Sequence, residues 1–209
     1  MHLLYIADPL CSWCYGFGPE LDKLVARRPD AQLDVIMGGL RPFNREPMSA
    51  PFKAMLREHW AQVARASGLP FDDAVLDREG WVYDTEPPCR AVVVARGLEA
   101  ARALRYMKAI QSAFYRDGRD VTRTDVLADV AAESGYDREK FLAWFESDAA
   151  RAQTRADFAT AQSLGVGGFP TLGVAYGPQV YLVTSGFVTG DVLEDRLEEI
   201  DRRAAQARA

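Results

Sequence analysis

The sequence predicts an α/β protein built from a strand–helix–strand unit, a long helical block and a strand–strand–helix unit. Short apolar runs at 3–7 and 33–37 flank a segment with helical periodicity, the pattern that produces a parallel strand pair. Strand patterns return only at 171–176 and 180–184, and the residues between show helical spacing. The helical block therefore interrupts what would otherwise be one small α/β core.

Turn residues mark the ends of the elements in the first unit. Asp8-Pro9 ends the first strand, and Gly38-Gly39 closes the second. The helix between them contains Gly16, Gly18 and Pro19 near its start, so we expect its first turns to be kinked or loosened.

Helix signals recur through the middle of the chain. Ser49-Ala50-Pro51 has the residues of a helix start, and Gly68 is the corresponding stop. Thr124 or Asp125 is predicted to cap a later helix, and Asp137 to open another. Further helical patterns cover 89–98, 104–114 and a stretch that ends at Leu164.

The final unit begins with a hairpin. Tyr176-Gly177-Pro178-Gln179 separates the last two strand patterns and predicts a tight turn, after which an amphipathic helix closes the chain. We therefore divide the chain into an α/β domain, residues 1–45 and 160–209, and a helical insertion domain, residues 46–159.

Composition and charge argue against several classes of function. A net charge of -5, with acidic and basic residues intermixed, does not favour a nucleic-acid partner. No apolar run reaches the roughly 18 residues of a transmembrane helix, so no membrane association is predicted. The first strand starts almost at Met1, which leaves no room for a secretory leader and predicts a cytoplasmic location.

The chain has three cysteines, and two of them form Cys11-Ser12-Trp13-Cys14 at the junction between the first strand and the first helix. Unpaired backbone N–H groups and the helix dipole favour an anion at that point, here the thiolate of Cys11. Cys14 lies one turn further in, where it can resolve a mixed disulfide by attacking Cys11. The spacing thus predicts a redox-active pair.

A zinc site and a pair of inert cysteines are the alternatives for Cys11 and Cys14. Zinc needs about four ligands, and only Cys89, His2 and His59 remain, scattered along the chain. No metal is therefore expected.

A second motif, Gly165-Val166-Gly167-Gly168-Phe169-Pro170-Thr171, precedes the third strand. Together with Asp8-Pro9-x-Cys11-x-Trp13-Cys14-Tyr15-Gly16, it resembles the DsbA family, and most closely its cytoplasmic FrnE-like branch of predicted protein-disulfide isomerases. The resemblance implies a thioredoxin-like fold with a helical insertion. It also implies that Pro170 is cis and faces the cysteines, so that Phe169, Pro170 and Thr171 bind substrate as an added strand.

Two positions depart from the relatives that the sequence resembles. Many thioredoxin-fold enzymes carry a buried carboxylate where this chain has Tyr5, so the proton of Cys14 needs another acceptor, either Asp8 or water. Ser12-Trp13 replaces the Pro-His of strongly oxidising members, so we expect less stabilisation of the thiolate.

Other residues near the motifs are candidates for accessory roles. Trp13 and Tyr15 are expected to form an apolar rim around the sulfurs, and Ser12 to contact substrate. Cys89 is either an auxiliary thiol or, as we favour, a buried apolar cysteine. Thr85 and Arg90 are candidates for lining the cleft, whereas His59 is expected to have a surface or packing role.

The sequence therefore predicts a thiol–disulfide oxidoreductase that acts on protein or peptide disulfides as oxidase, reductase or isomerase. A glutathione-dependent isomerase or transferase of the kappa and hydroxychromene-carboxylate type is the alternative, and a non-enzymatic chaperone is the third hypothesis. No cofactor is expected beyond the redox-active disulfide, with glutathione as a candidate co-substrate. A recycling redox partner is implied, and the choice between monomer and homodimer stays open.

Overall fold

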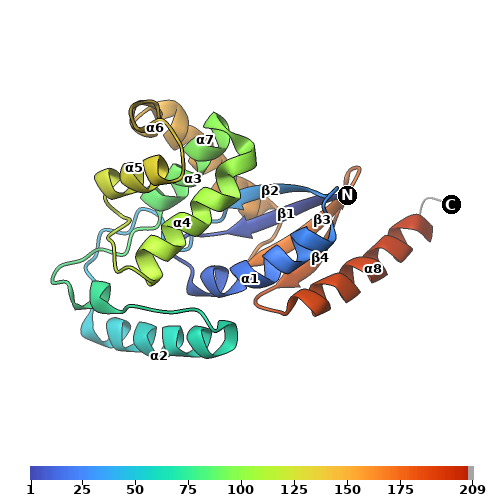
Figure 1. Ribbon diagram of the computed structural model, residues 1–209, viewed down its shortest axis with the longest axis horizontal. Coiled ribbons are helices and arrows are strands. Elements are labelled where there is room, and N and C mark those ends of the chain that lie inside the picture. The colour runs from blue at the N-terminus through green and yellow to red at the C-terminus, as the bar shows by residue number, and fades with distance from the viewer. Residues whose placement is uncertain (207–209) are drawn as a thin grey trace.

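The computed structural model describes residues 1–206 and contains a four-stranded mixed sheet in the order β2-β1-β3-β4 (Figure 1). β1 and β2 pair in parallel, whereas β1–β3 and β3–β4 are antiparallel. This is the predicted α/β class, with the helical block inserted between the two halves of the sheet. The strands are β1 (His2–Ala7), β2 (Gln32–Met37), β3 (Thr171–Tyr176) and β4 (Gln179–Ser185).

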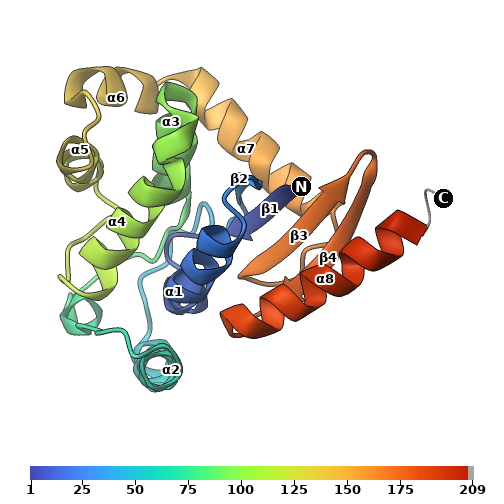
Figure 2. The same ribbon diagram turned by 45° about the vertical axis from the view of Figure 1, so that its right-hand side comes forward.

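Two helices lie together on one face of the sheet, α1 (Ser12–Arg27) and α8 (Gly190–Gln206) (Figure 2). Their close approach depends on Gly190, because a Cβ there would lie 3.0 Å from the Lys23 side chain and 3.3 Å from the Glu20 carbonyl. The Gly190 N–H also donates to the Glu20 carboxylate at 2.6 Å. This layer leaves the start of α1 at the carboxyl end of β1.

The insertion consists of helices that gather beside the sheet, with α2 set apart from the others and packed along α1 (Figure 1). Gly16 of α1 allows this packing, since a Cβ there would lie 2.6 Å from Val63 Cγ1. The helices are α2 (Ala50–Ser67), α3 (Glu86–Leu98), α4 (Ala103–Tyr115), α5 (Thr124–Glu133), α6 (Arg138–Phe145) and α7 (Asp148–Ser163), with short 3-10 turns η1 (Ala74–Asp77) and η2 (Ala100–Arg102).

The helix ends confirm several sequence predictions. The Ser49 side chain accepts the Phe52 N–H, the Asp137 side chain accepts the Lys140 N–H, and Gly68 ends α2 in the left-handed conformation.

Two other features of the helices differ from the local sequence signals. α1 runs unbroken through Gly16, Gly18 and Pro19, although Pro19 is its eighth residue and lacks the N–H for one backbone hydrogen bond of the helix. α5 begins at Thr124 after Arg123, without a side-chain cap.

The insertion is fastened to the outer edge of β2 by one ion pair. Asp157 of α7 accepts the Met37 N–H at 2.9 Å, and Arg96 of α3 donates to the Val35 carbonyl at 2.6 Å. Arg96 and Asp157 also pair with each other through two bonds of 2.8 Å. The two side chains thus take the hydrogen bonds that a neighbouring strand would otherwise make.

No helix within residues 1–206 is long and apolar enough to cross a membrane.

Candidate active site

The loop between β1 and α1 carries the cysteine pair. Asp8 shapes this loop, because its carboxylate accepts the Leu10 N–H at 2.8 Å and its carbonyl accepts the Cys11 N–H at 3.0 Å. Cys11 is the N-cap residue of α1 and makes no side-chain cap bond. Its sulfur therefore lies at a helix end whose first N–H groups are available to an anion.

Of the two cysteines, Cys11 lies nearer the surface and Cys14 lies deeper. Cys11 is 6% exposed and Cys14 1% exposed, and both are reduced. Burial raises the pKa of the Cys14 thiol well above its ordinary value, and a hydrogen bond with Cys11 adds to the rise. Cys14 is therefore a neutral thiol at rest, held directly against Cys11.

The loop before β3 faces the outer sulfur. The Cys11 thiol donates to the Phe169 carbonyl at 3.5 Å, and the Phe169–Pro170 peptide bond is cis. The Phe169 ring packs against Gly38, where a Cβ would lie 2.0 Å from the ring. Thr171 is buried, and its hydroxyl donates to the Gly168 carbonyl at 2.8 Å. Two motifs about 155 residues apart in the chain thus meet across the thiol.

A pocket of about 450 Å³ opens beside Cys11. Ser12, Trp13 and Phe169 form one side, and the insertion supplies the other. The lining residues from elsewhere in the chain are Leu10, Leu40, Arg41, Phe52, Met55, Leu56, His59, Trp60 and Tyr83. The walls are mostly apolar, with a small number of polar groups, as in pockets for small organic ligands.

Arg41 and His59 are two polar side chains of this pocket. The Arg41 guanidinium lies over the Phe52 ring, 4.6 Å from its centroid. His59 meets the Trp13 ring edge-on, with centroids 5.8 Å apart. His59 therefore packs on a site residue, and Arg41 gives the pocket a group that can pair with a carboxylate.

Asp8 and Cys89 form a buried pair beneath the loop. Both are fully buried, and the Cys89 thiol donates to the Asp8 carboxylate at 3.3 Å. The Leu40 N–H donates to the same carboxylate at 2.6 Å. Burial raises the pKa of Asp8, and burial followed by the charge of Asp8 raises the pKa of Cys89 well above its ordinary value.

The position that holds a carboxylate in many thioredoxin-fold enzymes is filled by a buried phenol. The Tyr5 hydroxyl points to the Cys14 carbonyl at 3.5 Å, and burial raises the pKa of Tyr5 well above its ordinary value. Tyr5 therefore stays protonated and cannot accept a proton from Cys14 at neutral pH.

Two residues predicted near the cleft lie elsewhere, and a third lies beneath it. Tyr15 is 7% exposed and stacks on Tyr115 with centroids 5.0 Å apart, so it belongs to the aromatic core and not to the rim. Thr85 is fully buried beneath the pocket, where its hydroxyl accepts the Arg41 N–H and hydrogen-bonds the Asp8 carboxylate. Arg90 is buried over the Phe145 ring at 4.0 Å. Each has a packing or backbone partner that its local sequence does not reveal.

Sequence reasoning also missed Arg41, Phe52 and Tyr83 as pocket residues. Arg41 and Tyr83 lie in the segments before α2 and α3, Phe52 lies in the first turn of α2, and only the tertiary fold brings them to the pocket beside Cys11. Within residues 1–206, no group of three or more His, Cys, Asp and Glu side chains is arranged to hold a metal ion.

Residues 5–198 match the family described as DSBA-like thioredoxin domain. The chain belongs to this DSBA-like family. The match covers β1 from Tyr5 onward, the other three strands, the cysteine pair, the whole insertion and about half of α8.

Solved structures of similar chains share the architecture. One from Nitrosomonas europaea, described as a candidate protein disulfide isomerase, is 33% identical, covers 97% of this chain and 98% of its own, and has a TM-score of 0.90. The cytosolic disulfide reductase DsbM from Pseudomonas aeruginosa is 26% identical, covers 99% and 100% of the two chains, and has a TM-score of 0.80. DsbM is also known in a structure with GSH.

A curated relative of this DSBA-like protein is the ClpXP adapter protein SpxH of Bacillus subtilis (strain 168). It is 23% identical over 180 residues, which cover 82% of this chain and 57% of SpxH. The chain thus spans little more than half the length of that relative.

Proposed function

We propose that this DSBA-like protein is a thiol–disulfide oxidoreductase that acts on protein or peptide disulfides through Cys11 and Cys14. One observation carries the proposal: Cys11 lies at a helix N-terminus against the Phe169–Pro170 loop, with the neutral thiol of Cys14 directly behind it. A thiol with this placement can attack from the surface, and a second thiol can displace the substrate from within.

The proposed cycle moves two electrons. The Cys11 thiolate attacks one sulfur of a substrate disulfide, a new S–S bond forms, and the other substrate sulfur leaves as a thiolate. Cys14 then attacks the Cys11 sulfur, which forms the Cys11–Cys14 disulfide and releases the second substrate thiolate. The substrate is reduced and the cysteine pair oxidised, and the reverse sequence oxidises a substrate dithiol.

Asp8 is the acceptor that we propose for the Cys14 proton. Its carboxylate is buried beside the pair, and its charge contributes to the raised pKa of Cys14. Replacing it by the isosteric amide, Asp8→Asn, should slow resolution of the mixed disulfide at pH 7 by about tenfold or more. Rapid quenching followed by intact mass measures this rate, and an unchanged rate would assign the proton to water.

Glutathione is the co-substrate that we propose for the pocket beside Cys11. It is a small anionic thiol, and Arg41 offers a partner for one of its carboxylates. The 26% identical reductase DsbM, which is also known in a structure with GSH, supports this proposal and a cytoplasmic location. A separate thiol partner would then return the Cys11–Cys14 pair to its starting redox state. The protein would act as a monomer or a homodimer.

Cys14 favours redox chemistry over the glutathione-dependent isomerase alternative. A catalyst that only binds and activates glutathione needs one nucleophile. A redox cycle needs in addition a second thiol that attacks the mixed disulfide, and Cys14 lies against Cys11 in the place for that role.

The test is to trap the intermediate. Cys14→Ser should accumulate one glutathione per chain, bound at Cys11, after treatment with oxidised glutathione, and should lose insulin reduction. Cys11→Ser should neither trap glutathione nor reduce insulin. Full insulin reduction by Cys11→Ser would overturn the proposal.

A further inference from the structure

The peptide directly before Cys11 is held at both ends. Leu10 is fully buried, and its N–H donates to the Asp8 carboxylate. Its carbonyl oxygen accepts two hydrogen bonds, one from the Tyr115 hydroxyl at 2.6 Å and one from the Tyr83 hydroxyl. Both lone pairs of this oxygen are therefore filled by phenols.

The two phenols come from separate parts of the insertion. Tyr115 is the last residue of α4, and Tyr83 lies in the segment before α3. Neither α1 nor the sheet supplies a donor for the Leu10 carbonyl. The helical insertion thus reaches the backbone of the redox loop, in addition to forming one wall of the pocket.

The surrounding rings leave the phenols little freedom. Tyr115 is fully buried and packs on Trp60 and Phe71, with centroids 5.1 and 5.2 Å away. Tyr83 is 3% exposed and packs on Trp81 at 5.6 Å. Burial raises the pKa of both tyrosines well above the ordinary value, so both stay donors at neutral pH.

We infer that Tyr83 and Tyr115 are positioning residues of the redox centre, which fix the Leu10–Cys11 peptide so that the Cys11 sulfur stays within bonding reach of Cys14. The inference rests on the proposed function, because it concerns closure of the Cys11–Cys14 disulfide. It makes the insertion a part of the redox centre and not only a substrate wall.

The physical reason is conformational entropy. Closing a disulfide fixes the backbone and side chain of both cysteines, and any freedom that the dithiol has is lost in that step. A loop that is already ordered in the reduced, dithiol state loses less conformational entropy when the disulfide closes. The effective concentration of Cys14 at Cys11 is therefore higher. Because both hydroxyls donate to the same carbonyl oxygen, either hydrogen bond alone should still hold the loop in most of its position when the other is removed.

The test compares three tyrosines that each donate to a buried backbone carbonyl. Tyr83→Phe, Tyr115→Phe and the double variant remove donors from Leu10. Tyr106→Phe is the matched control, because the Tyr106 hydroxyl donates to the Leu127 carbonyl at 2.8 Å and lies on the same helix as Tyr115. The readout is the equilibrium constant for the Cys11–Cys14 disulfide in mixtures of reduced and oxidised glutathione, followed by intact mass.

The double variant should favour the disulfide about fivefold less than the unmodified protein, the effect of one net hydrogen bond. Each single variant should lower it by a measurable factor of less than about twofold, and Tyr106→Phe should leave it unchanged while losing stability. If the double variant does not fold, the single variants provide the test. A lower disulfide equilibrium constant in Tyr83→Phe and Tyr115→Phe than in Tyr106→Phe supports the inference, and equal constants in the three variants overturn it.

An unchanged or increased constant in the folded double variant would also overturn the positioning role. That result differs from failure of the proposed function, in which the unmodified protein itself forms no Cys11–Cys14 disulfide at any glutathione ratio.

Discussion

The three thiols of the chain lie in different surroundings. Cys11 meets the Phe169 carbonyl and the pocket, Cys14 meets Cys11, and Cys89 meets the Asp8 carboxylate. The sequence distinguished Cys11 from Cys14 because their order along a helix determines depth. It could not assign a partner to Cys89, since Asp8 is 81 residues away in the chain.

Because two neutral thiols are buried, the free energy of unfolding of the reduced protein should fall at alkaline pH. Folding raises the pKa of Cys14 and Cys89 above the roughly 8.5 of an unfolded cysteine, so their contribution to stability is complete below that pH. It is lost as the pH rises toward the folded values, at about 1.4 kcal/mol per pH unit for each thiol.

Denaturant unfolding of the reduced protein from pH 7 to about 9, where the tyrosines of the unfolded chain are still mostly protonated, measures this decline. The Cys14→Ala, Cys89→Ala double variant should show a clearly shallower decline. Equal slopes for the two proteins would show that the thiols are not the cause.

At the scale of elements, the loop before β3 depends on a glycine of the loop after β2. A Cβ on Gly38 would enter the Phe169 ring, and the Phe169 carbonyl faces the Cys11 thiol. Gly38→Ala should therefore displace the loop and lower kcat/KM for disulfide reduction by about tenfold or more. Gly167→Ala is the control, because a Cβ there meets nothing within 4 Å. Equal activity of the two variants would contradict the coupling.

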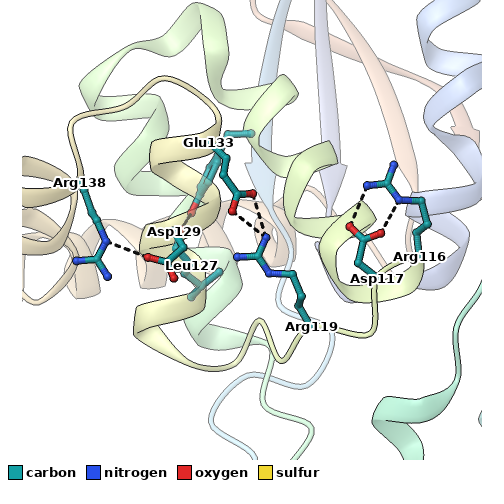
Figure 3. A network of polar contacts seen from close by, with 8 residues as sticks. Arg116, Asp117, Arg119, Leu127, Asp129, Glu133 and Arg138 are labelled. Carbon is teal, nitrogen blue, oxygen red and sulfur yellow. Dashed lines mark hydrogen bonds and ion pairs between the residues drawn. The ribbon is translucent and has the colours of Figure 1, made fainter.

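The attachment of the insertion to β2 makes a second prediction at this scale. Asp157→Ala leaves the Met37 N–H and the Arg96 guanidinium without their carboxylate, so it should cost about 2 kcal/mol or more of unfolding free energy. Asp129→Ala removes the partner of Arg138 from a half-exposed pair (Figure 3) and should cost less than about 0.5 kcal/mol. Denaturant unfolding measures both, and similar losses would show that Asp157 is only a surface charge.

At the scale of the whole molecule, the sequence predicted the order of elements, because turn residues and hydrophobic period are local signals. The two motifs, Cys11–Cys14 and Phe169–Thr171, were also visible as short patterns. The contribution of the insertion was not. Arg41, Tyr83 and Tyr115 carry no motif, and their approach to Leu10 and Cys11 depends on how α2, α3 and α4 pack. The expected positions of Tyr15 and Arg90 failed for the same reason.

The whole-molecule account makes the insertion and the α/β core two halves of one redox site. Its central claim is that Cys11 and Cys14 cycle between dithiol and disulfide. The most direct test is a redox titration of the full chain against reduced and oxidised glutathione, with peptide mass mapping of the disulfide at each ratio. The account predicts a two-electron transition that forms the Cys11–Cys14 disulfide and leaves Cys89 free. Absence of that disulfide at every ratio would contradict it.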